Sequence, residues 1–212
     1  MTGTNGLGAR LARLSAGLIA FAALAAMLPP IFNALGRGEG LGEAVWGLLR
    51  FFTILTNLIV AAVFVQLAWR GRHAVLPLVQ GGVMLAIALV GLVYNFVLSP
   101  MPQPNLWSAL GDDMHHFWVP LAVPLWWLVF APHRRLRWSA PLLWALYPLA
   151  YSGYVLLRAA GEAPDTPLRY PYPFMDAEAL GWATALGNMA AIAAAFVLAG
   201  LLAVAIDRKL PR

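Results

Sequence analysis

Apolar residues form six long stretches in this 212-residue chain, separated by short polar segments. A helix needs about 20 apolar residues to cross the hydrocarbon core of a bilayer. The stretches are rich in Ala, Leu and Val and lack the alternation of barrel strands, while the breaks contain Gly, Pro and charges. The predicted spans are 14–35, 44–69, 74–98, 106–131, 138–157 and 179–206. The pattern therefore predicts an all-α fold: a polytopic membrane bundle of six transmembrane helices within a single domain, 1–212.

The first stretch has a second interpretation as a signal peptide. Arg10 and Arg13 precede it, and small residues lie near its end. The apolar region of a secretory signal is usually shorter than this stretch, so the length favours a retained span over a cleaved one. Pro29 and Pro30 are expected to kink or end the helix late in the span.

Composition supports a lipid environment. Hydrophobic residues make up 61% of the chain and charged residues 11%, against roughly half and about a quarter in a soluble domain. The absence of cysteine excludes a disulfide framework, a thiolate metal site and a cysteine nucleophile. The net charge of +5 comes from short basic clusters between apolar stretches, which is typical of an orientation signal. We therefore expect the lipid bilayer as a partner, and no nucleic acid.

The basic clusters predict the orientation of the chain. Basic residues of membrane proteins concentrate in cytoplasmic loops. With the N-terminus in the cytoplasm, the inner side collects ten basic residues: Arg10, Arg13, Arg70, Arg72, Arg134, Arg135, Arg137, Arg208, Lys209 and Arg212. The outer side keeps only Arg37, Arg50, Arg158 and Arg169, and of nine acids only Asp207 lies inside. Both termini are thus expected in the cytoplasm, in a multi-pass protein of the plasma (inner) membrane.

Polar residues within the second predicted span are candidate functional groups, because charged and polar side chains are costly in a membrane. Arg50, Thr53 and Asn57 are spaced i, i+3, i+7, which would place them on one helical face. Thr53 would lie about 13 Å along a helix that begins at Ala44. Taken alone, Thr53 is better explained by a hydrogen bond to the backbone one turn back.

The third and fourth predicted spans add a second group at a similar depth. Asn95 lies near the outer end of the third span. If Asn105 caps the fourth helix, then His115 lies about 15 Å into it, and Asp112 precedes His115 by one turn. His116 follows directly and would point about 100° away from His115. Because adjacent ligands on one helix converge poorly, we expect neither a metal nor a haem, and no cofactor.

The fifth span and the loop after it carry further polar residues. Tyr154 and Arg158 lie on one stripe of the helix, and Tyr172 and Asp176 lie in the following outer loop. Snorkelling of the arginine and packing of the tyrosines are the alternative explanations. All these residues fall in the outer half of the protein, and this convergence predicts a polar site there.

Three segments resemble a known family. They are FFTILTNLI at 51–59, MHHFWVP at 114–120 and YPFMD at 172–176, and the similarity extends from Arg50 to Asp207. The chain resembles the androgen-induced, FAR-like integral membrane proteins of animals and their smaller bacterial relatives. The animal members are threonine hydrolases of fatty acid esters of hydroxy fatty acids. The resemblance implies that Thr53 is the nucleophile and His115 the base. This chain departs from the animal motifs at Thr56, where they have an acid, and at His116, where they have threonine.

The chemistry implied by the resemblance assigns roles to the other candidates. Histidine can take the proton from a threonine hydroxyl, and Asp112 is a candidate to fix its tautomer. Asn57 or Arg50 is a candidate to stabilise the oxyanion, and Arg158 or Arg169 to hold a lipid carboxylate. The expected substrate is a lipid ester. The alternative is a non-enzymatic membrane protein that binds a lipid or another small hydrophobic ligand, or a transporter, although no inverted repeat is visible.

Overall fold

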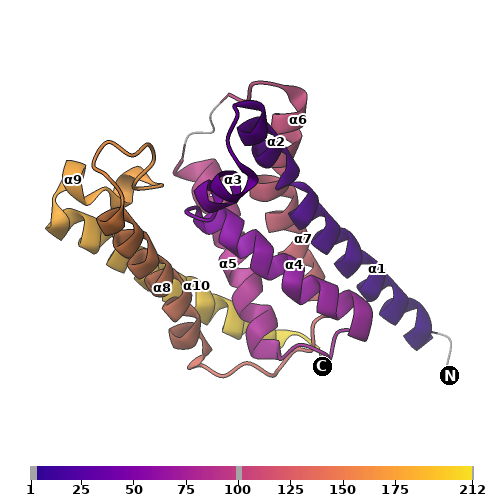
Figure 1. The fold of residues 1–212 in the computed structure, drawn as a ribbon. Helices are drawn as coiled ribbons and strands as arrows, with labels where there is room; N and C mark the ends of the chain where they lie inside the picture. Colours follow the sequence, from indigo (N-terminus) through magenta and orange to yellow (C-terminus); the bar gives the residue numbers. More distant parts are fainter. Residues whose placement is uncertain (1–3, 99–101, 212) are drawn as a thin grey trace. The chain divides into compact units, whose positions relative to one another are not determined.

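The computed structural model describes residues 4–98 and 102–211, and these residues form helices joined by loops (Figure 1). The helices are α1 (Thr4–Ala25), α2 (Leu28–Gly36), α3 (Leu41–Leu48), α4 (Phe52–Arg70), α5 (Pro77–Phe96), α6 (Leu106–Asp113), a π-turn (Met114–Trp118), α7 (Val119–Phe130), α8 (Ala140–Gly161), a 3-10 turn (Pro173–Met175), α9 (Ala177–Leu180) and α10 (Trp182–Lys209). The all-α class predicted from the sequence is confirmed for this part of the chain.

Within residues 4–98 and 102–211, five helical segments are long and apolar enough to cross a membrane. They are Gly6–Gly36, Phe52–Arg70, Pro77–Phe96, Ala140–Gly161 and Trp182–Lys209. Each overlaps one of the predicted spans, and together they indicate a multi-pass membrane protein.

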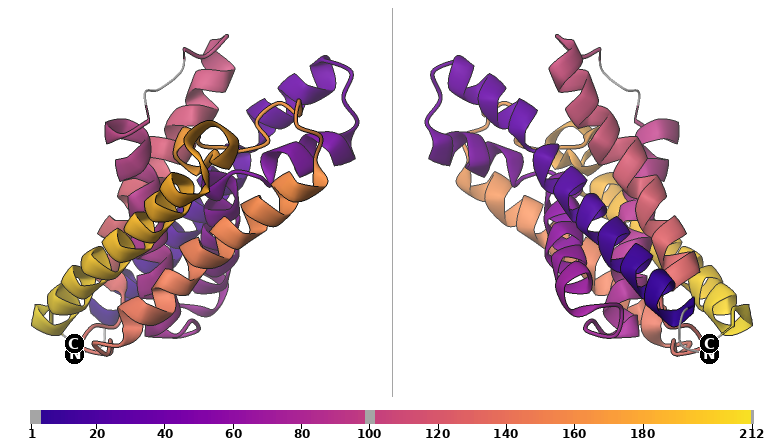
Figure 2. Two further views of the ribbon diagram at one scale, coloured as in Figure 1. Left: turned by 90° about the vertical axis from the view of Figure 1, so that its left-hand side faces the viewer. Right: turned by 90° about the vertical axis from the view of Figure 1, so that its right-hand side faces the viewer.

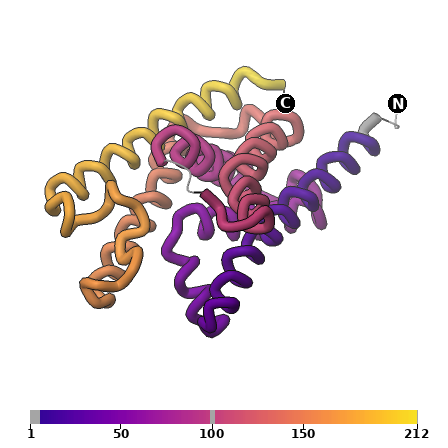
Figure 3. Tube along the Cα trace, turned by 90° about the horizontal axis from the view of Figure 1, so that it is seen from above, coloured from indigo at the N-terminus to yellow at the C-terminus, as the bar shows by residue number. Residues whose placement is uncertain are grey.

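The chain divides into two compact units, which are described separately. The first consists of Met1–Arg135 with Leu210–Arg212, and the second of Leu136–Lys209. In the first unit α1 packs along α4, α4 against α5, and α5 against α7. The top view in Figure 3 shows the long α1 at the N-terminal end of the chain. In the second unit α8 packs against α10, drawn in orange and yellow in Figure 2.

The predicted first span is broken where its prolines lie. α1 ends at Ala25 and α2 begins at Leu28, so that Pro29 occupies the first turn of α2. Proline is tolerated there because its missing N–H would have no helical partner. The prediction that these prolines kink or end the helix late in the span is confirmed.

The predicted second span is also broken, and here the prediction of one helix from 44 is wrong. α3 ends at Leu48, Phe51 is extended (φ −89°, ψ 131°), and α4 begins only at Phe52. α3 packs against α2, which explains why it does not continue along the axis of α4. Thr53 is therefore the second residue of its helix and does not lie deep inside one.

The predicted fourth span is helical without a break from Leu106 to Phe130, but its middle is a π-turn. Asn105 caps the start, as predicted: its side chain accepts a hydrogen bond from the Ser108 N–H at 2.8 Å. In the π-turn the N–H of Val119 donates to the carbonyl of Met114, five residues back.

Close helix packing supports this turn. A Cβ added to Gly91 in α5 would lie 2.7 Å from the Cβ of Pro120 and 3.3 Å from the carbonyl oxygen of His116. Glycine therefore lets α5 approach the π-turn more closely than any other residue would.

The C-terminal end of α4 is held by a residue of α1. The Arg13 guanidinium donates to the carbonyl of Ala68 at 2.8 Å, satisfying one of the last carbonyls of α4.

We predict opposite effects for two glycine substitutions in the first unit. Gly91→Ala should lower the free energy of unfolding by about 1–3 kcal/mol, because the new methyl group has no space. Gly47→Ala in α3 meets no atom within 4 Å and should be neutral or stabilise by up to about 1 kcal/mol. Unfolding in mixed micelles checks both variants. Equal effects would contradict the close approach of α5.

Candidate functional site

The hydroxyl of Thr53 is uncommitted. Thr53 is half-buried, and its hydroxyl makes no hydrogen bond to the described residues. No complete helical turn precedes it, so it lacks the usual backbone acceptor for a helical threonine. Thr56 does make this hydrogen bond to the backbone: its hydroxyl donates to the Phe52 carbonyl at 2.7 Å. Thr53 is thus the threonine available for chemistry.

Free backbone donors surround Thr53. The first hydrogen bond of α4 runs from the Leu55 N–H to the carbonyl of Phe51 at 3.2 Å. The N–H groups of Thr53 and Ile54 precede it and have no partner in the described part of the chain. The start of a 19-residue helix also favours negative charge. Sequence reasoning missed these donors, because phenylalanine at 51 is not a capping residue and does not mark a helix start.

Asn57 lies one turn further along α4 and is completely buried. Its side-chain N–H donates to the carbonyl of Thr53 at 2.9 Å, while its Oδ1 has no partner among the described residues. The amide oxygen is an acceptor, and one of the two N–H groups of Nδ2 is already bonded to the Thr53 carbonyl. The N–H groups of Thr53 and Ile54 are therefore further candidates for the role expected of Asn57.

Arg50 does not share a helical face with Thr53 and Asn57. It lies in the turn between α3 and α4, where its Nε donates to the carbonyl of Gly47 at 3.2 Å. The prediction from the i, i+3, i+7 spacing is wrong because it assumed one continuous helix.

His115 lies in the π-turn and is 4% exposed. The π-turn packs against α1, α4 and α5. Nε2 of the ring is buried and has no partner in the part of the chain that the structure describes. A buried polar atom without a partner destabilises a protein by about 1–3 kcal/mol, so it demands an explanation. No direct hydrogen bond joins the described side chains of His115 and Thr53.

Asp112 contacts His116, whereas the sequence had suggested His115. Its Oδ1 lies 3.0 Å from Nδ1 of His116, and its Oδ2 accepts a hydrogen bond from the Tyr94 hydroxyl at 2.5 Å. The rings of Tyr94 and His116 stack, with centroids 3.6 Å apart and planes 6° apart. His116 faces α5, whereas His115 points to another side of the turn, and the expected orienting role of Asp112 therefore applies to His116. Sequence reasoning did not single out Tyr94.

Asn95 belongs to the same cluster. Its side-chain N–H donates to the carbonyl of His116 at 3.0 Å and to the carbonyl of Gly91 at 2.8 Å. The structure thus brings Asn95, Asp112 and His116 together on one side of the π-turn.

The remaining predicted residues belong to the second unit and have structural partners there. Arg158 has a buried side chain, and its guanidinium donates to Glu162 and to the hydroxyl of Tyr154, each at 2.9 Å. Two side chains of the second unit thus already contact Arg158, and its expected use for a lipid carboxylate stays a prediction.

The loop of the second unit is held in a similar way. Tyr172 stacks on Phe174, with centroids 5.3 Å apart. Asp176 caps α9, accepting hydrogen bonds from two backbone N–H groups at 3.0 and 2.9 Å. Arg169 donates to the carbonyl of Ala159 at 2.7 Å and pairs with Glu178. These contacts give the three residues structural roles.

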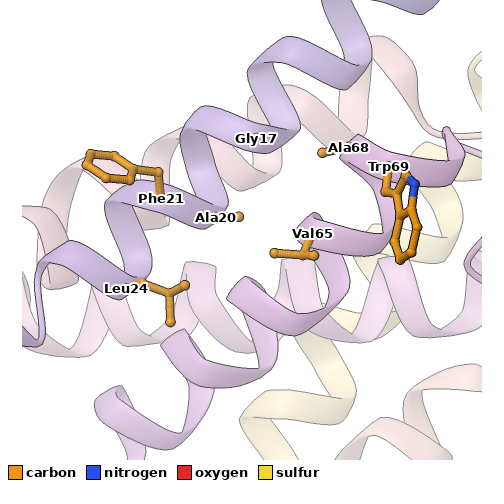
Figure 4. A pocket seen from close by; sticks show the side chains of 7 residues that line it. All are labelled: Gly17, Ala20, Phe21, Leu24, Val65, Ala68 and Trp69. Atoms are coloured by element: carbon orange, nitrogen blue, oxygen red, sulfur yellow. The ribbon is translucent and has the colours of Figure 1, made fainter.

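A groove between α1 and α4 offers no chemistry of its own (Figure 4). Its lining is apolar and consists of Gly17, Ala20, Phe21, Leu24, Val65, Ala68 and Trp69. The exposed Phe21 and Trp69 on its rim are suited to contact with lipid chains. It lacks a nucleophile and an ionisable side chain, and the candidate site therefore remains at Thr53 and His115.

Comparisons with protein-family models, with curated proteins and with solved structures found no match for this chain.

Proposed function

We propose that this protein is an integral membrane hydrolase of fatty acyl esters, with Thr53 as nucleophile and His115 as general base. One observation carries the proposal. An uncommitted threonine hydroxyl lies at the start of α4, and the π-turn that packs on this helix carries a buried histidine nitrogen without a partner. A hydroxyl is the kind of donor that such a nitrogen lacks.

The reaction proceeds in two steps. His115 takes the proton of the Thr53 hydroxyl, and the oxygen attacks the ester carbonyl carbon. The ester C–O bond then breaks, the leaving alcohol takes the proton from His115, and an acyl-threonine remains. In the second step His115 takes a proton from water, and the water oxygen attacks the acyl carbon. The bond to the Thr53 oxygen then breaks, His115 returns the proton to that oxygen, and the fatty acid is released. The free N–H groups of Thr53 and Ile54 are the candidate donors to the oxyanion in both steps.

The base and nucleophile must come closer during the reaction. Catalytic hydrogen bonds are often long or absent in a free enzyme and form in the substrate complex. The buried acceptors Nε2 of His115 and Oδ1 of Asn57 favour a bound group with hydroxyl donors, or a water, between the π-turn and α4.

The membrane setting follows from the same proposal. We place six spans in the plasma (inner) membrane with both termini in the cytoplasm, the segment 106–130 being the crossing that adds to the five long helices. The start of α4 would then lie towards the outer surface, near headgroup depth. A lipid ester could reach Thr53 from the outer leaflet with its acyl chains still in the bilayer.

The first test is labelling of the detergent-purified protein with a fluorescent fluorophosphonate, which reacts with activated hydroxyls. We expect labelling of the parent and of Thr53→Ser, none of Thr53→Ala, and a rate at least about 100-fold lower for His115→Ala. Thr56→Ala is the matched control, because it removes a hydroxyl that is already bonded to the backbone. It should label at the parent rate.

Two outcomes would overturn the proposal. Labelling that survives Thr53→Ala would assign the nucleophile to another residue. A well-folded parent that does not label at all would favour a protein that binds a lipid or another hydrophobic ligand without cleaving it.

The proposed orientation can be tested with single cysteines, because the chain has none of its own. Asp165→Cys lies in the exposed loop after α8 and should react with a membrane-impermeant maleimide on intact cells. His73→Cys, in the exposed loop after α4, should react only after the membrane is permeabilised. The reverse pattern would invert the topology and place Thr53 towards the cytoplasm.

A further inference from the structure

The π-turn has a cause in the sequence of α7. Pro120 has no N–H, so the carbonyl of His116, four residues back, has no helical donor. The proline ring also crowds that carbonyl, and the helix widens into a π-turn, in which the N–H of Val119 donates to the carbonyl of Met114 and not to that of His115. Such turns change the direction in which the following side chains point.

One side of this turn is fixed to α5 by a complete set of contacts. Asn95 supplies the donor that the carbonyl of His116 lacks, at 3.0 Å, and Gly91 leaves the space for this approach. Asp112 uses both carboxylate oxygens, one for Nδ1 of His116 and one for the Tyr94 hydroxyl. His116 is thereby held by the stacking of its ring on Tyr94, by the contact of Nδ1 with Asp112 and by the hydrogen bond to its carbonyl.

The orientation of the His116 ring also determines the direction in which His115 points. Adjacent residues of a helical turn point in different directions, so a ring locked against α5 directs its neighbour away from that helix. The two rings are 6.2 Å apart and inclined at 74°. His115 is directed to the buried side of the turn, where Nε2 has no partner among the described residues.

We propose that Tyr94, Asn95, Asp112 and His116 are positioning residues that hold the π-turn so that His115 presents Nε2 to the Thr53 site. The inference rests on the proposed hydrolase function for its kinetic consequence, but the orientation of His115 can be measured without any reaction. These four residues restrain the conformation of the π-turn, and that conformation sets the orientation of the His115 ring.

The test combines histidine NMR with labelling kinetics. The chain has four histidines, so the purified protein labelled with ¹⁵N-histidine has a simple spectrum. The parent should show one histidine with a strongly hydrogen-bonded Nδ1–H, assigned to His116 by its loss in His116→Gln. Asp112→Asn should weaken this signal and shift the His115 resonances. Asp113→Asn, a neutralisation of the adjacent exposed acid, should change neither.

The kinetic arm separates positioning from substrate binding. For Asp112→Asn and Tyr94→Phe we expect the maximal rate of fluorophosphonate labelling to fall about 10- to 100-fold, because a small displacement of a base slows the reaction strongly. The reagent concentration at half-maximal rate should stay unchanged. Asn95→Asp, which replaces the donor with an acceptor of the same shape, should behave like Asp112→Asn, whereas Asp113→Asn should match the parent.

The outcomes distinguish this inference from the function on which it rests. If the parent does not label, but Asp112→Asn shifts the His115 resonances, the hydrolase proposal fails and the positioning of His115 stands. If the parent labels at Thr53, and Asp112→Asn and Tyr94→Phe label at the parent rate with unchanged His115 resonances, the positioning role is overturned.

Discussion

The missing N–H of Pro120 is the constraint on which the proposed site depends. It leaves the His116 carbonyl without a helical donor, and the helix widens into a π-turn. The side chain of Asn95 in α5 supplies the hydrogen bond that this carbonyl lacks. In this π-turn the side chain of His116 faces α5, and that of His115 points away from α5. A buried histidine nitrogen without a partner would be a defect in an ordinary helix pair. Here it is a consequence of a turn that several residues hold in place, and this is what favours a functional explanation.

The second determinant is the late start of α4. Because the helix begins at Phe52, Thr53 has, among the residues that the structure describes, neither a backbone acceptor for its hydroxyl nor an acceptor for its own N–H. The proposed nucleophile and the candidate oxyanion donors thus come from one feature, the start of a helix. Thr56, three residues later, has its hydroxyl bonded to the backbone and illustrates what Thr53 would do in a continuous helix. Two irregularities in otherwise ordinary apolar helices therefore generate the polar chemistry of the first unit.

Much of the fold could be predicted from local signals. The helical class followed from apolar stretches, the break near Pro29 from the missing N–H, and the start of α6 from the capping side chain of Asn105. The start of α4 could not be predicted, since Phe51 carries no capping signal and the break depends on packing of α3 against α2. The partner of Asp112 was also beyond reach, because it depends on which face of the turn meets Tyr94 on another helix.

The most direct test of the central claim is to locate the fluorophosphonate adduct by mass spectrometry. Trypsin should release residues 51–70, a peptide whose only hydroxyl side chains are Thr53 and Thr56. Fragmentation between these residues separates a free hydroxyl at the start of α4 from one bonded to the backbone. We predict the phosphonyl group on Thr53. An adduct on Thr56, or on a different peptide, would contradict the assignment of Thr53 as the nucleophile.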